Sequence, residues 1–167
     1  MTTPARADIR TALRDASAHL LAYFERRVTP RADAADLLAE TMLTVWRRVD
    51  RLPADAERQR MWLFAIAANV LANHRRSLSR RSALADRLRQ HLATSTYLVD
   101  EGETHAVRDA VLRLPYAHRE LITLVHWDGF SLAEAAEILN VNPSTARSRY
   151  GAAKAALHSM LEGSRIG

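Results

Sequence analysis

The sequence predicts an all-α protein of two small helical domains joined by a flexible linker. Helix-forming Ala, Leu, Arg and Glu dominate, and the 167 residues include only 5 Gly and 5 Pro. Apolar residues recur at intervals of three and four, which is the period of an α-helix. This pattern fades over 82–104, so we expect domains at 1–81 and 105–162, a linker between them with at most a short helical piece at 83–92, and a tail at 163–167.

Three helices are predicted in the first domain, over residues 7–27, 32–49 and 57–79. Pro30 separates the first two, because a proline disfavours helix in the residue before it, and Pro53 ends the second. The third helix is apolar around most of its circumference. It is therefore expected at the centre of its domain.

The formal net charge of +5 favours an anionic partner such as nucleic acid. The basic excess is almost wholly arginine, since Lys154 is the only lysine, and arginine suits phosphate and base recognition. An Ala- and Arg-rich composition is equally what a GC-rich genome encodes, whatever the function. The basic residues gather at the end of the third predicted helix and beyond it, where a single acid, Asp86, accompanies His74, Arg75, Arg76, Arg80, Arg81, Arg87 and Arg89.

The segment 127–157 predicts two short helices joined by a tight turn. Ser131 and Glu134 form a capping box, so a helix is expected directly after Ser131. Asn140 can adopt the left-handed conformation that ends this helix, and Asn142 can cap the next one. Residues that are expected to face the core recur at helical spacing in both helices: Ala135, Ala136 and Leu139 in the first, and Ala146, Tyr150 and Ala153 in the second.

The second helix of this pair carries small polar and arginine side chains outward. Serine and threonine can bond phosphates or base edges, and arginine can donate to guanine, so the pair favours DNA binding in the major groove as a helix-turn-helix. The alternative is a helical hairpin whose Arg147 and Arg149 are merely solvated. The candidate contacts are Asn142, Ser144, Thr145, Arg147, Ser148 and Arg149, with Arg147 first among them.

Several function classes are disfavoured by what the chain lacks. It has no cysteine, which excludes disulfides, thiolate chemistry and cysteine-ligated metal sites. His118 and His126 can share a face of a helix predicted over 116–126 but lack a third ligand, and there is no phosphate loop or nucleophile elbow. We therefore expect no enzyme, no catalytic residue, no metal and no cofactor. Without a membrane-spanning apolar run or a signal peptide, a cytoplasmic protein is expected.

Three segments follow one another in an order that is typical of one family. Residues 31–52, RADAADLLAETMLTVWRRVDRL, place an Asp-Leu pair before Glu-Thr and Val-Trp. Residues 60–76, RMWLFAIAANVLANHRR, contain Trp-Leu, Ile-Ala and Asn, and residues 113–157 run from Leu-Pro through the predicted recognition helix. The chain thus resembles a bacterial RNA polymerase sigma factor of the extracytoplasmic-function (ECF) type, which has only regions 2 and 4 of the sigma-70 family.

The resemblance implies a protein that binds core RNA polymerase and directs promoter-specific transcription initiation. Region 4 would read the minus-thirty-five element through the six residues given above. It would also abut the β flap, for which Leu121 and Leu124 are candidates that suit the core better. Region 2 would dock on the β′ clamp helices through Asp36, Leu37, Glu40, Thr41 and Trp46. Of these, Trp46 suits the core better. Region 2 would also bind the minus-ten element through Asn69, Asn73, His74, Arg75 and Arg76.

The chain departs from the family pattern in two places. Ala65 and Ala68 stand where members often carry arginine, and residues 53–60 lack the usual aromatic run, so minus-ten contacts carry over less directly. The family also implies an anti-sigma factor as a partner, in which any thiol sensing would have to reside. A stand-alone helix-turn-helix regulator is the alternative, although it would need dimerisation and no coiled-coil heptad is visible.

Overall fold

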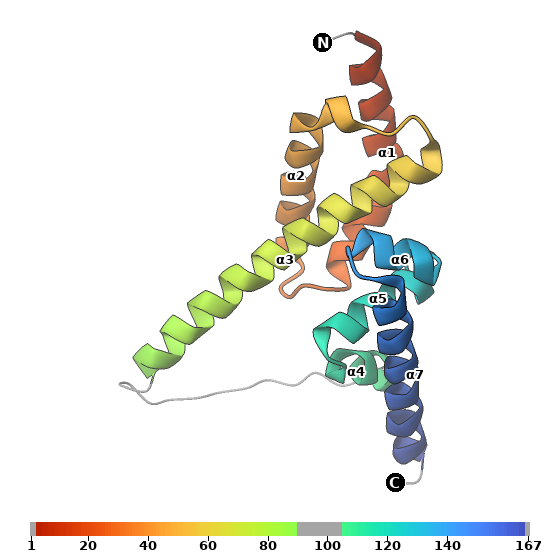
Figure 1. Ribbon diagram of the computed structural model, residues 1–167. Helices are drawn as coiled ribbons and strands as arrows, with labels where there is room; N and C mark the ends of the chain where they lie inside the picture. The colour runs from red at the N-terminus through yellow and green to blue at the C-terminus, as the bar shows by residue number, and fades with distance from the viewer. Residues whose placement is uncertain (1–2, 90–104, 166–167) are drawn as a thin grey trace. The chain divides into compact units, whose positions relative to one another are not determined.

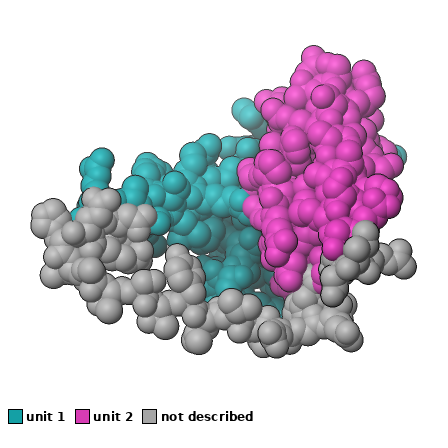
Figure 2. Space-filling view, turned by 90° about the horizontal axis from the view of Figure 1, so that it is seen from below, with its two compact units in different colours: residues 1–94 teal, residues 95–167 magenta. Residues whose placement is uncertain are grey.

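Helices form all the regular secondary structure that the computed structural model describes, over residues 3–89 and 105–165 (Figure 1). This confirms the predicted all-α class. The chain divides into two units, Met1–Thr94 and Ser95–Gly167, which we call unit 1 and unit 2 (Figure 2). None of the described helices combines the length and the apolar character needed to cross a membrane.

Unit 1 is built from three α-helices, α1 (Thr3–Glu25), α2 (Ala32–Arg47) and α3 (Ala56–Arg89). A single 3-10 turn, η1 (Val49–Arg51), follows α2. Helix α3 packs against both α1 and α2 (Figure 1). It therefore holds the central position that its apolar circumference predicts.

The core of unit 1 is centred on three aromatic rings that α1 and α3 contribute. The ring of Tyr23 meets the ring of Phe24 edge to face at 5.2 Å and the ring of Phe64 at 5.5 Å. All three side chains are fully buried. Edge-to-face rings add to the free energy of apolar burial, so this cluster fixes α3 against α1.

Helix α3 is longer than predicted. The expected end at residue 79 is wrong, because the helix continues to Arg89, through part of the segment expected as linker. The reason is local, since the stretch 77–89 contains neither glycine nor proline and is rich in Ala, Leu and Arg. Its last turns extend beyond α1 and α2 (Figure 1). The rest of the expected linker lies outside the described residues.

Unit 2 contains α4 (His105–Arg113), α5 (Tyr116–His126), α6 (Leu132–Ile138) and α7 (Pro143–Arg165). Helix α7 packs against the other three. In the core, its Ala153 joins the buried side chains of Val111, Leu114 and Ile122. Helix α5 has the bounds that the sequence predicts, whereas α7 continues through the first residues of the expected tail.

The connection from α5 to α7 is fixed by local backbone and side-chain hydrogen bonds. Gly129 has φ 75° in the turn after α5. The Ser131 hydroxyl accepts from the Glu134 backbone N–H at 3.2 Å, and the Ser131 N–H donates to the Glu134 carboxylate at 2.7 Å. This is the predicted capping box. Asn140 has φ 51°, as predicted for the residue that ends α6.

Candidate nucleic-acid and protein interfaces

The start of α7 presents the polar face that the sequence predicts for DNA. The side chains of Ser144, Arg147 and Ser148 are exposed, whereas Thr145 and Arg149 are half-buried. This difference in exposure follows from the helical period, because residues 145 and 149 lie on the side of α7 that carries the buried Ala146. Three of the six predicted contacts therefore share an open surface, two lie at its margin, and the sixth, Asn142, is exposed directly before the helix.

Asn142 caps α7 and orders its first turn. The side-chain oxygen of Asn142 accepts from the Ser144 backbone N–H at 2.9 Å and from the Ser144 hydroxyl at 2.7 Å. The NH₂ group on the same side chain can only donate, which suits a phosphate or base acceptor. The cap thus leaves Asn142 a role in binding while it fixes where α7 begins.

Small residues extend the polar face of α7 along the helix, and the sequence reasoning missed them. Gly151 and Ala155 follow Ser144 and Ser148 at spacings of three and four, and all four are exposed. A Cβ added at Gly151 would meet nothing within 4 Å. With such short side chains the helix backbone can come close to another surface. In the sequence, these positions could have been found from the helical spacing of small residues at 144, 148, 151 and 155.

A polar and aromatic contact joins α5 to α7 beside this face. The His126 ring nitrogen Nε2 and the Tyr150 hydroxyl are 2.9 Å apart, and the two rings stack with centroids 6.0 Å apart. The Lys154 ammonium lies 5.6 Å from the centroid of the Tyr150 ring. Trp127 meets His126 edge to face at 6.5 Å. Of these contacts, the one between His126 and Tyr150 links α5 to α7.

Helix α2 presents the second predicted surface, but with different members. The expectation that Trp46 belongs to the core is wrong, since this side chain is 41% exposed. Asp36 and Glu40 are exposed one turn apart, on the side of α2 that neither α1 nor α3 covers. Leu43, which the sequence reasoning missed, is 57% exposed and follows Glu40 by three residues. Acidic and apolar groups thus lie together on an open helix face.

Two of the five residues predicted on this α2 surface point inward. Leu37 is 4% exposed and Thr41 is 0% exposed. The Thr41 hydroxyl donates to the Leu37 carbonyl oxygen at 2.7 Å, which satisfies its buried oxygen within the helix. These two side chains therefore pack the core of unit 1, and we leave them out of the proposed surface.

The minus-ten candidates on α3 divide into two groups. Asn69, Asn73 and Arg76 are exposed at spacings of four and three, so they share one face. Arg76 donates to the side-chain oxygen of Asn73. His74 and Arg75 are half-buried on other sides of the helix, and His74 Nε2 lies 3.7 Å from an Asp33 carboxylate oxygen of α2. The first group alone forms a continuous open surface.

The two leucines considered for the β flap belong to the core of unit 2. Leu121 and Leu124 on α5 are fully buried. Their burial agrees with the reading of both as core residues. These two side chains are therefore not available for a contact with the β flap.

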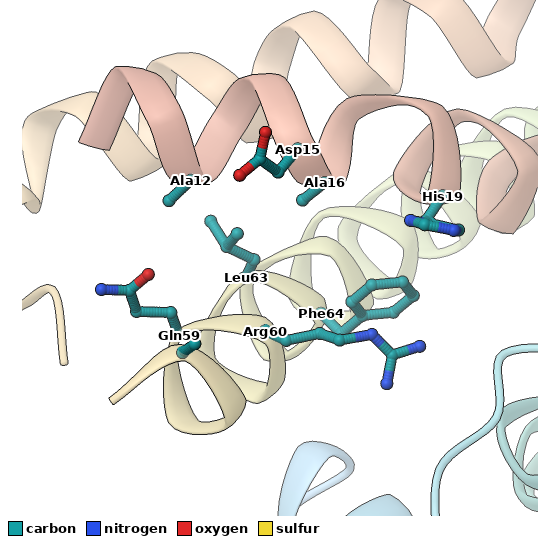
Figure 3. Close-up of a pocket in the computed structure, with 9 residues that line it drawn as sticks. Ala12, Asp15, Ala16, His19, Gln59, Arg60, Leu63 and Phe64 are labelled. Carbon is teal, nitrogen blue, oxygen red and sulfur yellow. The ribbon is translucent and has the colours of Figure 1, made fainter. Parts of the chain in front are cut away.

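A hollow of about 250 Å³ lies between α1 and the start of α3 (Figure 3). Its polar lining consists of Asp15, His19, Gln59 and Arg60, and the buried Leu63 and Phe64 form part of its wall. Within the described residues, no group of three or more His, Cys, Asp or Glu side chains is placed to hold a metal ion.

Both halves of the chain match one protein family. Residues 10–81 match sigma-70 region 2, and residues 104–157 match sigma-70, region 4. The RNA polymerase sigma factor NccH of Alcaligenes xylosoxydans xylosoxydans is 30% identical over 145 residues, which cover 82% of this chain and 77% of NccH. The chain therefore belongs to the sigma-70 family of RNA polymerase sigma factors.

The ECF type within this family is indicated by further relatives. The ECF RNA polymerase sigma factor SigL of Mycobacterium tuberculosis is 28% identical over 162 residues, which cover 95% of this chain and 92% of SigL. Members of this class direct transcription initiation, and the family is not generally catalytic. The assignment does not favour a stand-alone regulator.

Two solved structures have a fold similar to that of this chain. The sigma factor RpoE of Bartonella quintana, determined in complex with the anti-sigma factor NepR, has a TM-score of 0.69 at 22% identity, covering 93% of this chain and 97% of that one. CnrH, determined in complex with the cytosolic domain of CnrY, has a TM-score of 0.66 at 23% identity, covering 95% and 90%. At these identities the likeness concerns the fold.

Proposed function

We propose that this sigma factor binds core RNA polymerase through α2 and selects promoters through two DNA-binding faces, one on α3 and one on α7. The observation that carries the proposal is the exposed, capped start of α7 within a region 4 helix-turn-helix. The protein acts by binding and positioning rather than by catalysis. Because transcription initiation in bacteria takes place in the cytoplasm, we place the protein there.

The face on α7 suits the major groove at the minus-thirty-five element. Ser144 and Ser148 can bond base edges or phosphates, and the short side chains of Gly151 and Ala155 let the helix backbone approach the groove closely. Arg147 and Lys154, seven residues apart on one edge of this face, are placed to reach phosphates or guanine. Short side chains in the centre of the face let the helix enter the major groove, and cations at its edge can reach the phosphates that line the groove.

The face on α3 suits the minus-ten element. Asn69 and Asn73 can recognise the edges of unpaired bases, and Arg76 can neutralise the backbone beside them. His74 and Arg75 are left out of this face, because packing turns them aside. The proposal therefore reduces the five candidates to three.

The face on α2 suits a basic helical partner, which we identify with the β′ clamp helices. Asp36 and Glu40 supply negative charge, and the exposed Leu43 and Trp46 supply apolar area beside it. Tryptophan is enriched among the residues that dominate binding energy at protein interfaces, which fits the exposed Trp46. The similar sigma factor RpoE, whose structure includes the anti-sigma factor NepR, supports an anti-sigma partner for this chain too.

Reconstitution tests the proposal. Purified full-length chain is added to core polymerase from the source bacterium, and start sites on genomic DNA are mapped by sequencing the transcripts. The expected result is a small set of start sites that share two sequence elements. If the chain neither binds core polymerase nor yields promoter-specific transcripts, the proposal is wrong.

A charge reversal on α2 tests the polymerase-binding face separately. Glu40→Lys should weaken binding to core polymerase, whereas Asp15→Lys, an equal change of charge on an exposed site of α1, should not. Binding is measured by titration with fluorescently labelled protein, and circular dichroism checks that both variants keep their helices. Equal losses in the two variants would show a general effect of charge instead of a docking face.

A further inference from the structure

The direction of the hydrogen bond between the side chains of Asn142 and Ser144 is fixed by their chemistry. The Ser144 backbone nitrogen is 2.9 Å from one terminal atom of the Asn142 side chain, and because an N–H can only donate, that atom is the oxygen Oδ1. The Ser144 hydroxyl oxygen is 2.7 Å from the same Oδ1. Since Oδ1 carries no proton, the hydroxyl donates its only proton to it.

This arrangement makes the Ser144 hydroxyl an acceptor toward any outside group. Its proton is directed to Asn142, so only its lone pairs remain for a further hydrogen bond. The Ser144 side chain is exposed, and a ligand can therefore reach it. Asn142 Oδ1 in turn accepts two hydrogen bonds, which uses both of its lone pairs.

Reversing the Ser144 hydroxyl so that it donates outward would cost a hydrogen bond. Asn142 Oδ1 would lose one of its two donors, and a water molecule could not replace that donor once DNA covers the face. A base that accepts from Ser144 thus gains one hydrogen bond at the expense of another. A base that donates to Ser144 adds a hydrogen bond and breaks none. The pair therefore favours a donor over an acceptor.

The four bases differ in this same property where they face the major groove. Adenine and cytosine present an exocyclic amino group that donates, whereas guanine and thymine present a keto oxygen that accepts. Ser144 lies in the first turn of α7, within the region 4 match. The first residues of a recognition helix are the ones that contact base edges. The position of Ser144 and the direction of its hydrogen bond thus concern the same groups on the DNA.

We infer that Ser144 selects a base with an exocyclic amino group in the minus-thirty-five element, and that Asn142 is the positioning residue that sets this preference. The inference rests on the proposed function and deepens it. That function assigns the start of α7 to the major groove, whereas the hydrogen bonds of Asn142 and Ser144 specify which kind of base edge is read there.

Ser148 provides a comparison on the same face. It is also exposed, one turn further along α7, but within the described residues its hydroxyl is not held by another side chain. This hydroxyl can rotate, so it can donate or accept. We therefore expect the preference for an amino group to depend on Ser144 alone.

Binding of holoenzyme to modified promoter duplexes tests the inference. The probe is a duplex fragment with the minus-thirty-five element of a start site mapped with the wild-type holoenzyme. Each adenine of the element is replaced in turn by 2-aminopurine, and each cytosine by 2-pyrimidinone. These analogues still pair but lack the amino group in the major groove. Wild-type affinity should fall about two- to tenfold at the base that Ser144 contacts, as expected for one hydrogen bond. Whether that base is adenine or cytosine distinguishes the two sources of the amino group.

Substitutions of the two serines identify the contacted base. Ser144→Ala should bind the native and the modified fragment equally at one position where the wild type does not. Ser148→Ala should bind all fragments more weakly but keep the wild-type ratio at that position. Ratios between fragments are compared, so a uniform change in affinity cancels. Alanine is a good helix former, and circular dichroism checks that the helices remain.

Substitutions of Asn142 test the positioning role. In a third fragment the amino group becomes a keto oxygen, through guanine for adenine or uracil for cytosine, each with its matching partner base. The wild type should bind this fragment no better than the analogue fragment, because Ser144 cannot donate. Asn142→Ala releases the hydroxyl, so binding to the keto fragment should rise about two- to tenfold relative to the analogue fragment. Asn142→Asp keeps an acceptor oxygen at this place and should retain the wild-type ratio.

Three results would overturn the inference. The first is that no position distinguishes the wild type from Ser144→Ala, and the second is that the position which does so carries guanine or thymine on both strands of the tested promoters' preferred sequence at the contacted edge. The third is an unchanged ratio of keto to analogue binding in Asn142→Ala. If the wild-type holoenzyme yields mapped start sites, each of these results refutes the inference alone. Absence of promoter-specific transcripts from the wild-type holoenzyme would refute the proposed function and the inference with it.

Discussion

Unit 2 places its binding face on a helix whose start is fixed by local hydrogen bonds, whereas unit 1 exposes faces that the packing of three helices leaves uncovered. In unit 2, Ser131 and Glu134 begin α6, Asn140 ends it, and Asn142 begins α7. Each of these devices acts within four residues of sequence. In unit 1, the position of α3 depends on rings that meet across the bundle, such as Tyr23 and Phe64.

The difference shows which kind of binding face a sequence can encode locally. A capped helix end dictates which residues begin the helix and therefore which of them point outward. A long helix in the centre of a bundle has no such local mark, and its open face is decided by the neighbours that cover the other sides. We therefore expect substitutions in the two units to differ in kind, and the following experiments can contradict or sharpen this contrast.

The largest effect is expected from Phe64→Ala in unit 1. This ring is 1% exposed and contacts Tyr23, so its removal should lower the free energy of unfolding by about 3–5 kcal/mol. Hydrogen exchange measured by mass spectrometry should show faster exchange throughout unit 1 and unchanged protection in α5–α7. Leu43→Ala, at an exposed site, is the control and should change stability by less than about 0.5 kcal/mol. Loss of protection in both units would contradict their independence.

The next effect concerns recognition in unit 2. Arg147→Ala should weaken binding of holoenzyme to a mapped promoter fragment by about 1–3 kcal/mol, with helicity unchanged, because an exposed contact to a base or phosphate is lost. Arg108→Ala removes the same charge from an exposed site on α4 and should have little effect. Competition against fragments with altered minus-thirty-five bases separates a contact to a base from a contact to a phosphate. A loss that is equal on all fragments would assign Arg147 to phosphate.

The elements of unit 2 follow closely from its sequence. The bounds of α5, the capping box and the left-handed Asn140 all agree with the prediction, because each depends on residues near one another in the chain. Burial of Glu120, which is 1% exposed on α5, could not be predicted, because its charge favours solvent. The polar start of α7 was predicted, but the small residues that extend it were not.

In unit 1, the helices could be predicted better than their exposed faces. Trp46 is expected in the core, yet it is exposed, whereas Leu37 and Thr41 from the same predicted surface are buried. Helical periodicity identifies an apolar stripe but does not say which edge of it the neighbouring helices cover. Apolar periodicity fades before α3 ends, so it predicts too short a helix. In fact the sequence stays rich in helix formers to Arg89.

A smaller effect is expected from the cap that begins α6. Ser131→Ala removes the acceptor for the Glu134 N–H and should lower the stability of unit 2 by about 1 kcal/mol. Ser159→Ala, at an exposed position within α7, should be neutral or slightly stabilising, because alanine has the higher helix propensity. Urea denaturation followed through the fluorescence of Trp127 reports on this unit when Trp46 and Trp62 of unit 1 are replaced by Phe in every protein compared. If the two variants unfold at the same urea concentration, the cap does not contribute to stability.

The smallest effect separates the hydroxyl of Tyr150 from its ring. Tyr150→Phe keeps the stack on His126 but removes the hydrogen bond of 2.9 Å, so unit 2 should lose about 0.5 kcal/mol, since a half-exposed bond exchanges with water at little cost. Tyr150→Ala also removes ring contacts to the cluster around Ile122, and should cost clearly more. Equal losses in the two variants, measured by the same fluorescence assay, would show that the hydroxyl carries the whole contact. In that case a single polar bond, rather than packed rings, positions the recognition helix, and the contrast with the aromatic core of unit 1 becomes sharper.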